Sequence, residues 1–94
     1  MQESALERME GKRVLITGGL GFLGSNLAHK LVQLGAEEVV LYDAMLPAYG
    51  ANEENVSGIR DKVKIVKGDT RDFDKLAENV KEKDVIFNYA AQVS

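Results

Sequence analysis

Apolar residues gather in four short runs along the chain, and these runs predict four β-strands. Residues 14–16 are continuously aliphatic, which is typical of a parallel strand covered on both faces. Residues 38–43 form a second apolar run. Residues 62–67 alternate polar and apolar side chains, so this strand should have one exposed face or lie near a sheet edge. Residues 84–92 hold the fourth strand and its exit.

Helical spacing of apolar residues predicts two helices between these strands. The first spans 22–34 and ends at Gly35. Its leucines form one apolar stripe that should lie on the sheet: Leu23, Leu27, Leu31 and Leu34. Asp72 is the expected N-cap of the second helix, over 73–80. The residues of this helix expected to face inward are Leu76 and Val80.

A long connection, 44–61, joins the second and third strands, and 52–57 within it should form one or two helical turns. Three of its side chains can reach a ligand, but we expect them in solvated loop: Tyr49, Asn52 and Asn55. His29 lies off the leucine stripe and is expected to be a solvated helix residue. Residues 1–11 precede the fold as a leader or a short helix.

The composition is that of one small globular domain. The 94 residues are 45% hydrophobic and 29% charged, and the net charge of −3 gives no electrostatic footprint for nucleic acid. No apolar run approaches the length of a membrane span. The chain has no cysteine and a single histidine, His29, so a protein-held metal site is not expected. We therefore expect a cytoplasmic α/β domain without nucleic-acid or membrane partners.

Glycines recur at three-residue intervals where the first strand turns into the first helix. Gly18 lets the chain turn sharply, Gly21 lets the backbone approach a pyrophosphate, and Gly24 lets the helix pack closely on the sheet. The helix points its N–H groups and its positive dipole end at this turn, so an anion is favoured there. No Gly-Lys-Ser/Thr follows the turn, which excludes a P-loop.

The stretch 17–24, Thr-Gly-Gly-Leu-Gly-Phe-Leu-Gly, resembles the short-chain dehydrogenase/reductase superfamily, and most closely its extended branch of nucleotide-sugar epimerases and dehydratases. The resemblance covers 12–94 and implies a Rossmann-type parallel sheet, the N-terminal portion of a doubly wound fold. Right-handed crossovers give the strand order 3-2-1-4. The cofactor-binding residues implied in the turn are Gly18, Gly21, Phe22, Leu23 and Gly24. A methyltransferase is a weaker alternative, because those domains usually have a tighter glycine spacing.

Asp43 ends the second strand, nineteen residues after Gly24, where an acid accepts hydrogen bonds from the adenosine ribose hydroxyls. A carboxylate there repels the 2′-phosphate of NADP, and no Arg or Lys occurs between Lys30 and Arg60. Leu20, inside the turn, is not basic either. The sequence therefore predicts NAD rather than NADP as the cofactor.

The resemblance implies further cofactor contacts at the ends of the third and fourth strands. In the extended family, a Gly-Asp pair after the third strand offers its carboxylate to the adenine amino group, assisted by the backbone of the next residue; Asp69 and Thr70 match this pattern. A small-residue pair at the end of the fourth strand packs beside the nicotinamide ribose, and Tyr89, Ala90 and Ala91 match it. The alternatives are a turn-forming Asp69 and a Tyr89 that belongs to the core.

The resemblance implies the NAD-binding portion of a nucleotide-sugar epimerase or dehydratase, which moves a hydride between a sugar carbon and NAD. Family members use a Tyr-x-x-x-Lys pair, which this sequence lacks: Tyr42, Tyr49 and Tyr89 are followed four residues later by Leu46, Glu53 and Val93. This chain alone is therefore expected to be inactive, and the nucleotide sugar to bind only in the complete enzyme. A non-catalytic dinucleotide-binding sensor or scaffold is the alternative.

The fourth strand has no expected neighbour on its outer side. Its apolar flank is Val85, Ile86 and Phe87. Because an edge strand presents unpaired backbone groups, we expect the chain to self-associate along this edge or to be only marginally stable.

Overall fold

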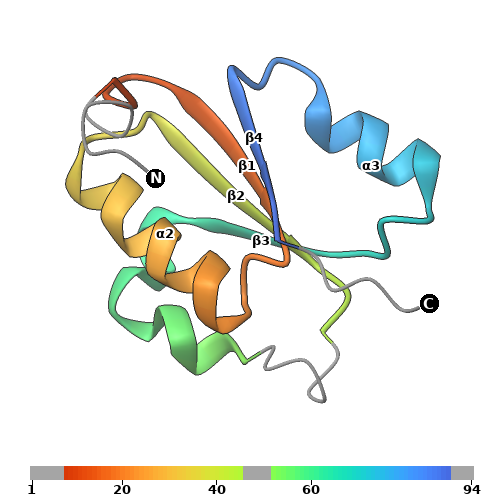
Figure 1. Ribbon diagram of the computed structural model, residues 1–94, viewed down its shortest axis with the longest axis horizontal. Helices are drawn as coiled ribbons and strands as arrows, with labels where there is room; N and C mark the ends of the chain where they lie inside the picture. The colour runs from red at the N-terminus through yellow and green to blue at the C-terminus, as the bar shows by residue number, and fades with distance from the viewer. Residues whose placement is uncertain (1–7, 46–51, 90–94) are drawn as a thin grey trace.

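The apolar runs form a parallel sheet in the computed structural model, which describes residues 8–45 and 52–89 (Figure 1). The sheet has four strands in the order β3-β2-β1-β4, and every neighbouring pair is parallel. The strands are β1 (Arg13–Thr17), β2 (Glu38–Asp43), β3 (Lys64–Lys67) and β4 (Val85–Asn88). The predicted order 3-2-1-4 is therefore confirmed, and β3 lies at an edge, as its alternating pattern indicated.

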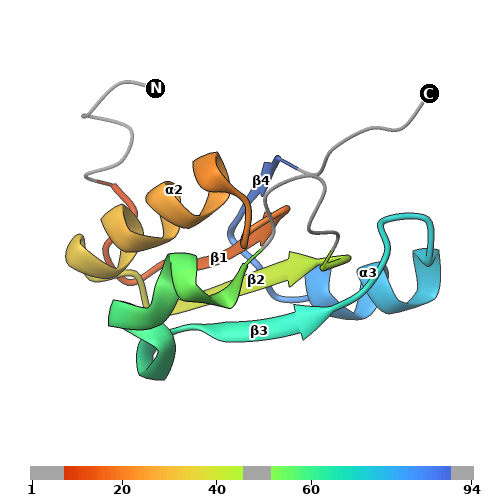
Figure 2. The same ribbon diagram turned by 90° about the horizontal axis from the view of Figure 1, so that it is seen from below.

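Helices cover both faces of this sheet (Figure 2). On one face, α2 (Phe22–Gln33) and η2 (Glu53–Lys62) bury a cluster that includes Val14 and Ile16 of β1. On the other face, α3 (Phe73–Val80) packs against a smaller cluster that includes Leu15 and Tyr42. Successive residues of β1 thus enter different cores, which is why its apolar run is continuous.

Two helix predictions need correction. Leu23, expected in the stripe that packs on the sheet, is 64% exposed, whereas Leu27 and Leu31 are buried as expected. Val80 of α3 is exposed rather than inward-facing, and the apolar residue of α3 that packs against the sheet is the partly buried Leu76. The N-cap of α3 is confirmed, since Asp72 Oδ1 accepts from Lys75 N–H at 3.2 Å. The helix α2 ends at Gln33, one residue earlier than predicted, and Gly35 follows with φ +83.

The connection after β2 is more ordered than its sequence predicts. It forms η2, two 3₁₀ segments joined at a kink, with Val56 and Ile59 buried in the larger core. Because η2 extends to Lys62, β3 begins only at Lys64. Tyr49 lies outside the described residues, as does most of the leader or short helix predicted over 1–11, of which only 8–11 is described, as a turn. Among the described helices, none has the length and apolar character needed to cross a membrane.

Candidate functional site

A glycine-lined turn joins the carboxyl end of β1 to the start of α2. Gly18 has φ +70, a left-handed conformation that favours glycine, and its N–H donates to the carbonyl of Tyr42 at 2.8 Å. A Cβ at Gly24 would collide with the carbonyl oxygen of Gly18 and lie 2.9 Å from Gly19 Cα. Gly18 therefore makes the turn, as predicted, and Gly24 lets α2 approach that turn, whereas its predicted contact was with the sheet.

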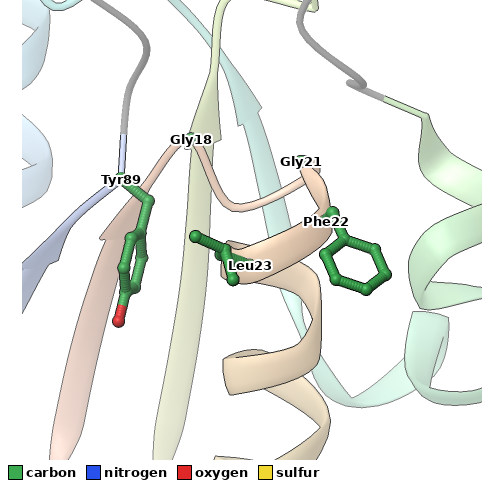
Figure 3. A pocket seen from close by; sticks show the side chains of 6 residues that line it. Gly18, Gly21, Phe22, Leu23 and Tyr89 are labelled. Atoms are coloured by element: carbon green, nitrogen blue, oxygen red, sulfur yellow. The ribbon is translucent and has the colours of Figure 1, made fainter. Parts of the chain in front are cut away.

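The amino end of α2 faces a pocket of about 240 Å³ above this turn (Figure 3). Gly21 is the N-cap of the helix and makes no side-chain capping bond, and the first turn holds no acidic residue. The pocket residues are Gly18, Gly21, Phe22, Leu23, Gly24 and Tyr89. The structure thus brings together six of the sequence-predicted site residues. Backbone N–H groups at an uncapped helix start favour an anion here.

The exposure of Leu23 has its explanation in this pocket. Figure 3 shows Leu23 and Tyr89 on the same side of the turn, with Phe22 directed to the other side. Phe22 is 74% exposed and Tyr89 38% exposed. Large apolar side chains beside an anion-favouring helix end suit a ligand with both charged and planar parts.

Asp43 lies under the turn and is 7% exposed. Its Oδ2 accepts from Leu20 N–H at 2.9 Å, and its Oδ1 accepts from Met45 N–H at 2.8 Å. Each carboxylate oxygen has two lone pairs, so both oxygens retain the capacity for a second hydrogen bond. The carboxylate therefore supports the glycine turn from the adjacent strand, a role that the sequence analysis did not foresee.

Asp69 follows β3 at the same end of the sheet as Asp43, and Arg71 forms hydrogen bonds to its carboxylate. The Arg71 guanidinium contacts Oδ2 at 2.7 Å, and the Arg71 N–H donates to Oδ1 at 2.8 Å. These bonds lower the pKa of Asp69 to about 2. Thr70, whose backbone was predicted to assist the contact with adenine, stands between Asp69 and Arg71 in the sequence and is half-buried. Arg71 is a charged neighbour that the sequence analysis missed.

Tyr42 holds the segment that carries Asp69. Its fully buried side chain donates its hydroxyl hydrogen to the Asp69 carbonyl at 2.8 Å. A Cβ at Gly68 would lie 2.5 Å from Tyr42 Cζ, so glycine is needed for this close contact. Burial raises the pKa of the Tyr42 phenol, and the negative charges of Asp72 and Asp69 add to the effect.

The end of β4 is fastened to β1 beside the pocket. Tyr89 N–H donates to the Thr17 carbonyl at 2.8 Å, and Thr17 Oγ1 donates to Asn88 Oδ1 at 2.5 Å. These bonds hold the backbone of Tyr89 at the end of β1, beside the turn. Ala90 and Ala91, which the sequence analysis placed at the nicotinamide ribose, are outside the described residues.

The solvated-loop interpretation of the β2–β3 connection is wrong for Asn55. Its side-chain Nδ2 donates to the Leu20 carbonyl at 2.7 Å, and its own carbonyl accepts from His29 Nε2 at 2.9 Å. His29 is correspondingly half-buried instead of solvated. The apolar Val56, one position later, was the sequence signal that this segment packs inward. No group of residues that could hold a metal ion occurs in 8–45 or 52–89.

Comparison with known proteins identifies the family to which this site belongs. The family model described as GDP-mannose 4,6 dehydratase matches residues 15–94, which include the glycine turn, Asp43 and Asp69. The chain belongs to this family. Membership accounts for the sheet, because the four strands form the N-terminal portion of the Rossmann-type fold of epimerase and dehydratase structures.

The similar proteins are named as dehydratases of nucleotide sugars or as an epimerase. A dTDP-glucose 4,6-dehydratase of Mycobacterium tuberculosis is 32% identical over 85% of this chain and 24% of its own length. A Bacillus anthracis dTDP-glucose 4,6-dehydratase solved with NAD has a TM-score of 0.75 and 36% identity over 86% of this chain and 27% of its own. The structure of an epimerase from Methanothermobacter thermautotrophicus has a TM-score of 0.80 and 34% identity, over 97% of this chain and 26% of its own. The family member described here therefore spans about a quarter of the length of these relatives.

Proposed function

We propose that this chain is the NAD-binding portion of a nucleotide-sugar epimerase or dehydratase. One observation carries the proposal: the uncapped amino end of α2 opens onto a pocket lined by Gly18, Gly21 and Gly24. Such a helix end attracts a diphosphate because its N–H groups and dipole both favour negative charge. The family match and the NAD complex of the Bacillus anthracis relative support the same cofactor.

Each part of NAD has a proposed place on the chain. The pyrophosphate lies on the turn, with the side chains of Phe22 and Leu23 beside it. Asp43 accepts hydrogen bonds from the adenosine ribose hydroxyls, using the oxygens that already bind Leu20 and Met45. The adenine amino group donates to Asp69, whose carboxylate is ionised at neutral pH. The backbone of Thr70 assists this contact with the adenine.

The nicotinamide ribose lies near Tyr89, Ala90 and Ala91. NAD is favoured over NADP because the buried Asp43 carboxylate repels a 2′-phosphate.

The proposed activity of the complete enzyme starts with oxidation at a sugar carbon. Bound NAD supplies the hydride acceptor for that step. This chain orients the cofactor, and the Tyr-x-x-x-Lys pair that would move the proton does not occur in its sequence. We therefore expect it to bind NAD without turnover, with the nucleotide sugar bound by the complete enzyme in the cytoplasm. A longer parent sequence without that pair would instead favour a non-catalytic sensor or scaffold.

Calorimetric titration of NAD and NADP into the chain tests the proposal. Wild type should bind NAD more tightly than NADP, and Asp43→Asn should weaken NAD about tenfold by replacing a charged acceptor of hydrogen bonds with a neutral amide. Asp61→Asn, an exposed position before β3, is the matched control and should bind as wild type. Failure to bind either cofactor would contradict the proposed function, and tighter NADP binding would contradict the assigned role of Asp43.

We also propose self-association along β4. In the described sheet this strand pairs with β1 on one side and lies at the edge, and its Ile86 is 48% exposed. An exposed apolar edge strand is a template for another strand. Sedimentation analysis should show a concentration-dependent dimer that Ile86→Lys abolishes. A wild-type monomer at all concentrations would contradict the proposal.

A further inference from the structure

Leu20 lies at the middle of the glycine turn, and its backbone is held from two sides. Its side chain is fully buried in the larger core. Its N–H donates to Asp43 Oδ2 at 2.9 Å, and its carbonyl accepts from Asn55 Nδ2 at 2.7 Å. The Asn52 N–H donates to the same carbonyl at 3.2 Å. The turn is therefore clamped between the end of β2 and the start of η2.

Asn55, whose side-chain amide binds the Leu20 carbonyl, has its own backbone held on both sides. The carbonyl of Asn55 accepts from His29 Nε2 on α2 at 2.9 Å, so this ring nitrogen must carry a hydrogen. The Asn55 N–H donates to the Asn52 carbonyl at 3.0 Å, and the next side chain, Val56, is fully buried. Figure 1 shows η2 alongside α2. Asn55 thus connects the helix, the core and the turn.

Fixing the Leu20 carbonyl also fixes the next N–H group. The carbonyl of Leu20 and the N–H of Gly21 belong to one planar trans peptide and point in opposite directions. Gly21 is the N-cap of α2, and its carbonyl accepts from Ser25 N–H at 2.9 Å. The orientation of the Leu20–Gly21 peptide therefore sets how the first turn of α2 meets the pocket.

We propose that Asn55 is a positioning residue of the phosphate subsite. It holds the Leu20–Gly21 peptide so that the amino end of α2 faces the pyrophosphate, and it does not contact the cofactor itself. This inference rests on the proposed function, since it assigns the phosphates to that helix end. Its consequence is selective: the clamp governs affinity for phosphate-bearing ligands and leaves the adenosine subsite, at Asp43 and Asp69, unchanged.

The test compares ADP with adenosine as probes of wild type and Asn55→Asp, by NMR shift titration. Asp has nearly the shape of Asn but directs an oxygen at the Leu20 carbonyl, which breaks the clamp. Asn55→Asp loses this hydrogen bond and places an oxygen against the Leu20 carbonyl, which then keeps only the longer bond from the Asn52 N–H, so ADP binding should weaken about tenfold. Adenosine binding should change less than about twofold, because Asp43 binds the Leu20 N–H, which belongs to a different peptide unit from the Leu20 carbonyl that Asn55 holds.

The matched control is Asn79→Asp on α3. There the amide also donates to a backbone carbonyl, that of Lys75 at 2.8 Å, but on the opposite face of the sheet from the clamp. This variant should bind both probes as wild type. Asn55→Ala, which removes the donor without adding charge, is the second variant if Asn55→Asp does not fold. Circular dichroism establishes folding for each.

The outcomes separate this inference from the proposed function. If wild type binds neither ADP nor adenosine, the proposed function fails and the positioning role fails with it. If wild type binds both and a folded Asn55 variant keeps its ADP affinity, the positioning role alone is overturned. Equal losses for ADP and adenosine would also overturn it, since they would indicate general structural damage. A selective loss of ADP affinity supports it.

Discussion

Replacing Gly24 by alanine probes the close approach of α2 to the glycine turn. The new Cβ would meet three backbone atoms: the carbonyl oxygen of Gly18, Gly19 Cα at 2.9 Å and the carbonyl carbon of Gly18 at 3.0 Å. No side-chain rotation can relieve these contacts, because every atom belongs to the main chain. The amino end of α2 must therefore move away from the turn.

The size of the effect follows from two opposing contributions. Overpacking a tight contact costs about 1–3 kcal/mol, and the upper part of that range applies where backbone must shift. Alanine in a helix is favoured over glycine by about 1 kcal/mol. The net loss of unfolding free energy for Gly24→Ala should then be about 1–2 kcal/mol. NAD affinity should fall about tenfold, since the helix end leaves its place above the turn.

Urea denaturation and calorimetric titration measure the two effects. Gly58→Ala is the matched control, because its Cβ would meet only His29 Cε1, at 3.9 Å. It should be as stable as wild type or slightly more stable, and should bind NAD normally. If Gly24→Ala proves as stable as Gly58→Ala and binds NAD like wild type, the requirement for glycine at this contact is refuted.

The remaining predictions concern the Asp69 segment. Arg71→Gln should raise the pKa of Asp69 from about 2 toward its ordinary value, and carbon NMR titration of the carboxyl group would show no change if Arg71 is not the cause. Because this pKa is depressed in the folded chain, the stability that the ionised carboxylate contributes is present above pH 3.8 and lost as pH falls through about 2. Tyr42→Phe removes one hydrogen bond to Asp69 and should lower unfolding free energy by about 1 kcal/mol in thermal melts. The pKa of Tyr42 is raised in the folded chain, so its effect on the pH dependence of stability is opposite to that of Asp69. Stability should be intact below pH 10 and should decline as the pH rises above it. Ultraviolet titration should show the phenol ionising over the same range of pH in which stability declines.

The fold was predictable from the sequence because its determinants are local. The aliphatic run at 14–16 is typical of a strand covered on both faces, and right-handed crossovers in the Rossmann-type fold that the glycine turn resembles lead to the observed strand order. Position 24 does require a glycine, although the backbone that the helix approaches there is the Gly18–Gly19 turn, whereas the predicted contact was with the sheet.

Helical periodicity predicted burial wrongly where a helix extends beyond the part of the sheet on which it packs. Leu23 has the spacing of Leu27 and Leu31, yet it lies in the first turn of α2, beside the pocket instead of over the sheet. Val80 fails for the same reason in the last turn of α3. Spacing specifies which residues share a helix face, but not how much of that face has a partner. An apolar residue in a terminal turn beside a glycine-lined turn is therefore a ligand-contact candidate as well as a core candidate.

Neighbours separated in sequence determine the chemistry of the site, and sequence spacing does not reveal them. No Arg or Lys occurs between Lys30 and Arg60, but Arg71 lies near the end of β2 in space. The Gly68 N–H donates to the Asp43 carbonyl at 3.0 Å, which brings the ends of β2 and β3 together. Arg71 does not change the proposed preference for NAD, because its guanidinium group is bound to Asp69. A cation compensated in this way is not free to balance a 2′-phosphate, and the Asp43 carboxylate binds two neutral N–H groups and no cation in the described structure. Cofactor preference in this fold therefore depends on which charges the parallel strand ends pair with one another, as much as on which residues are present.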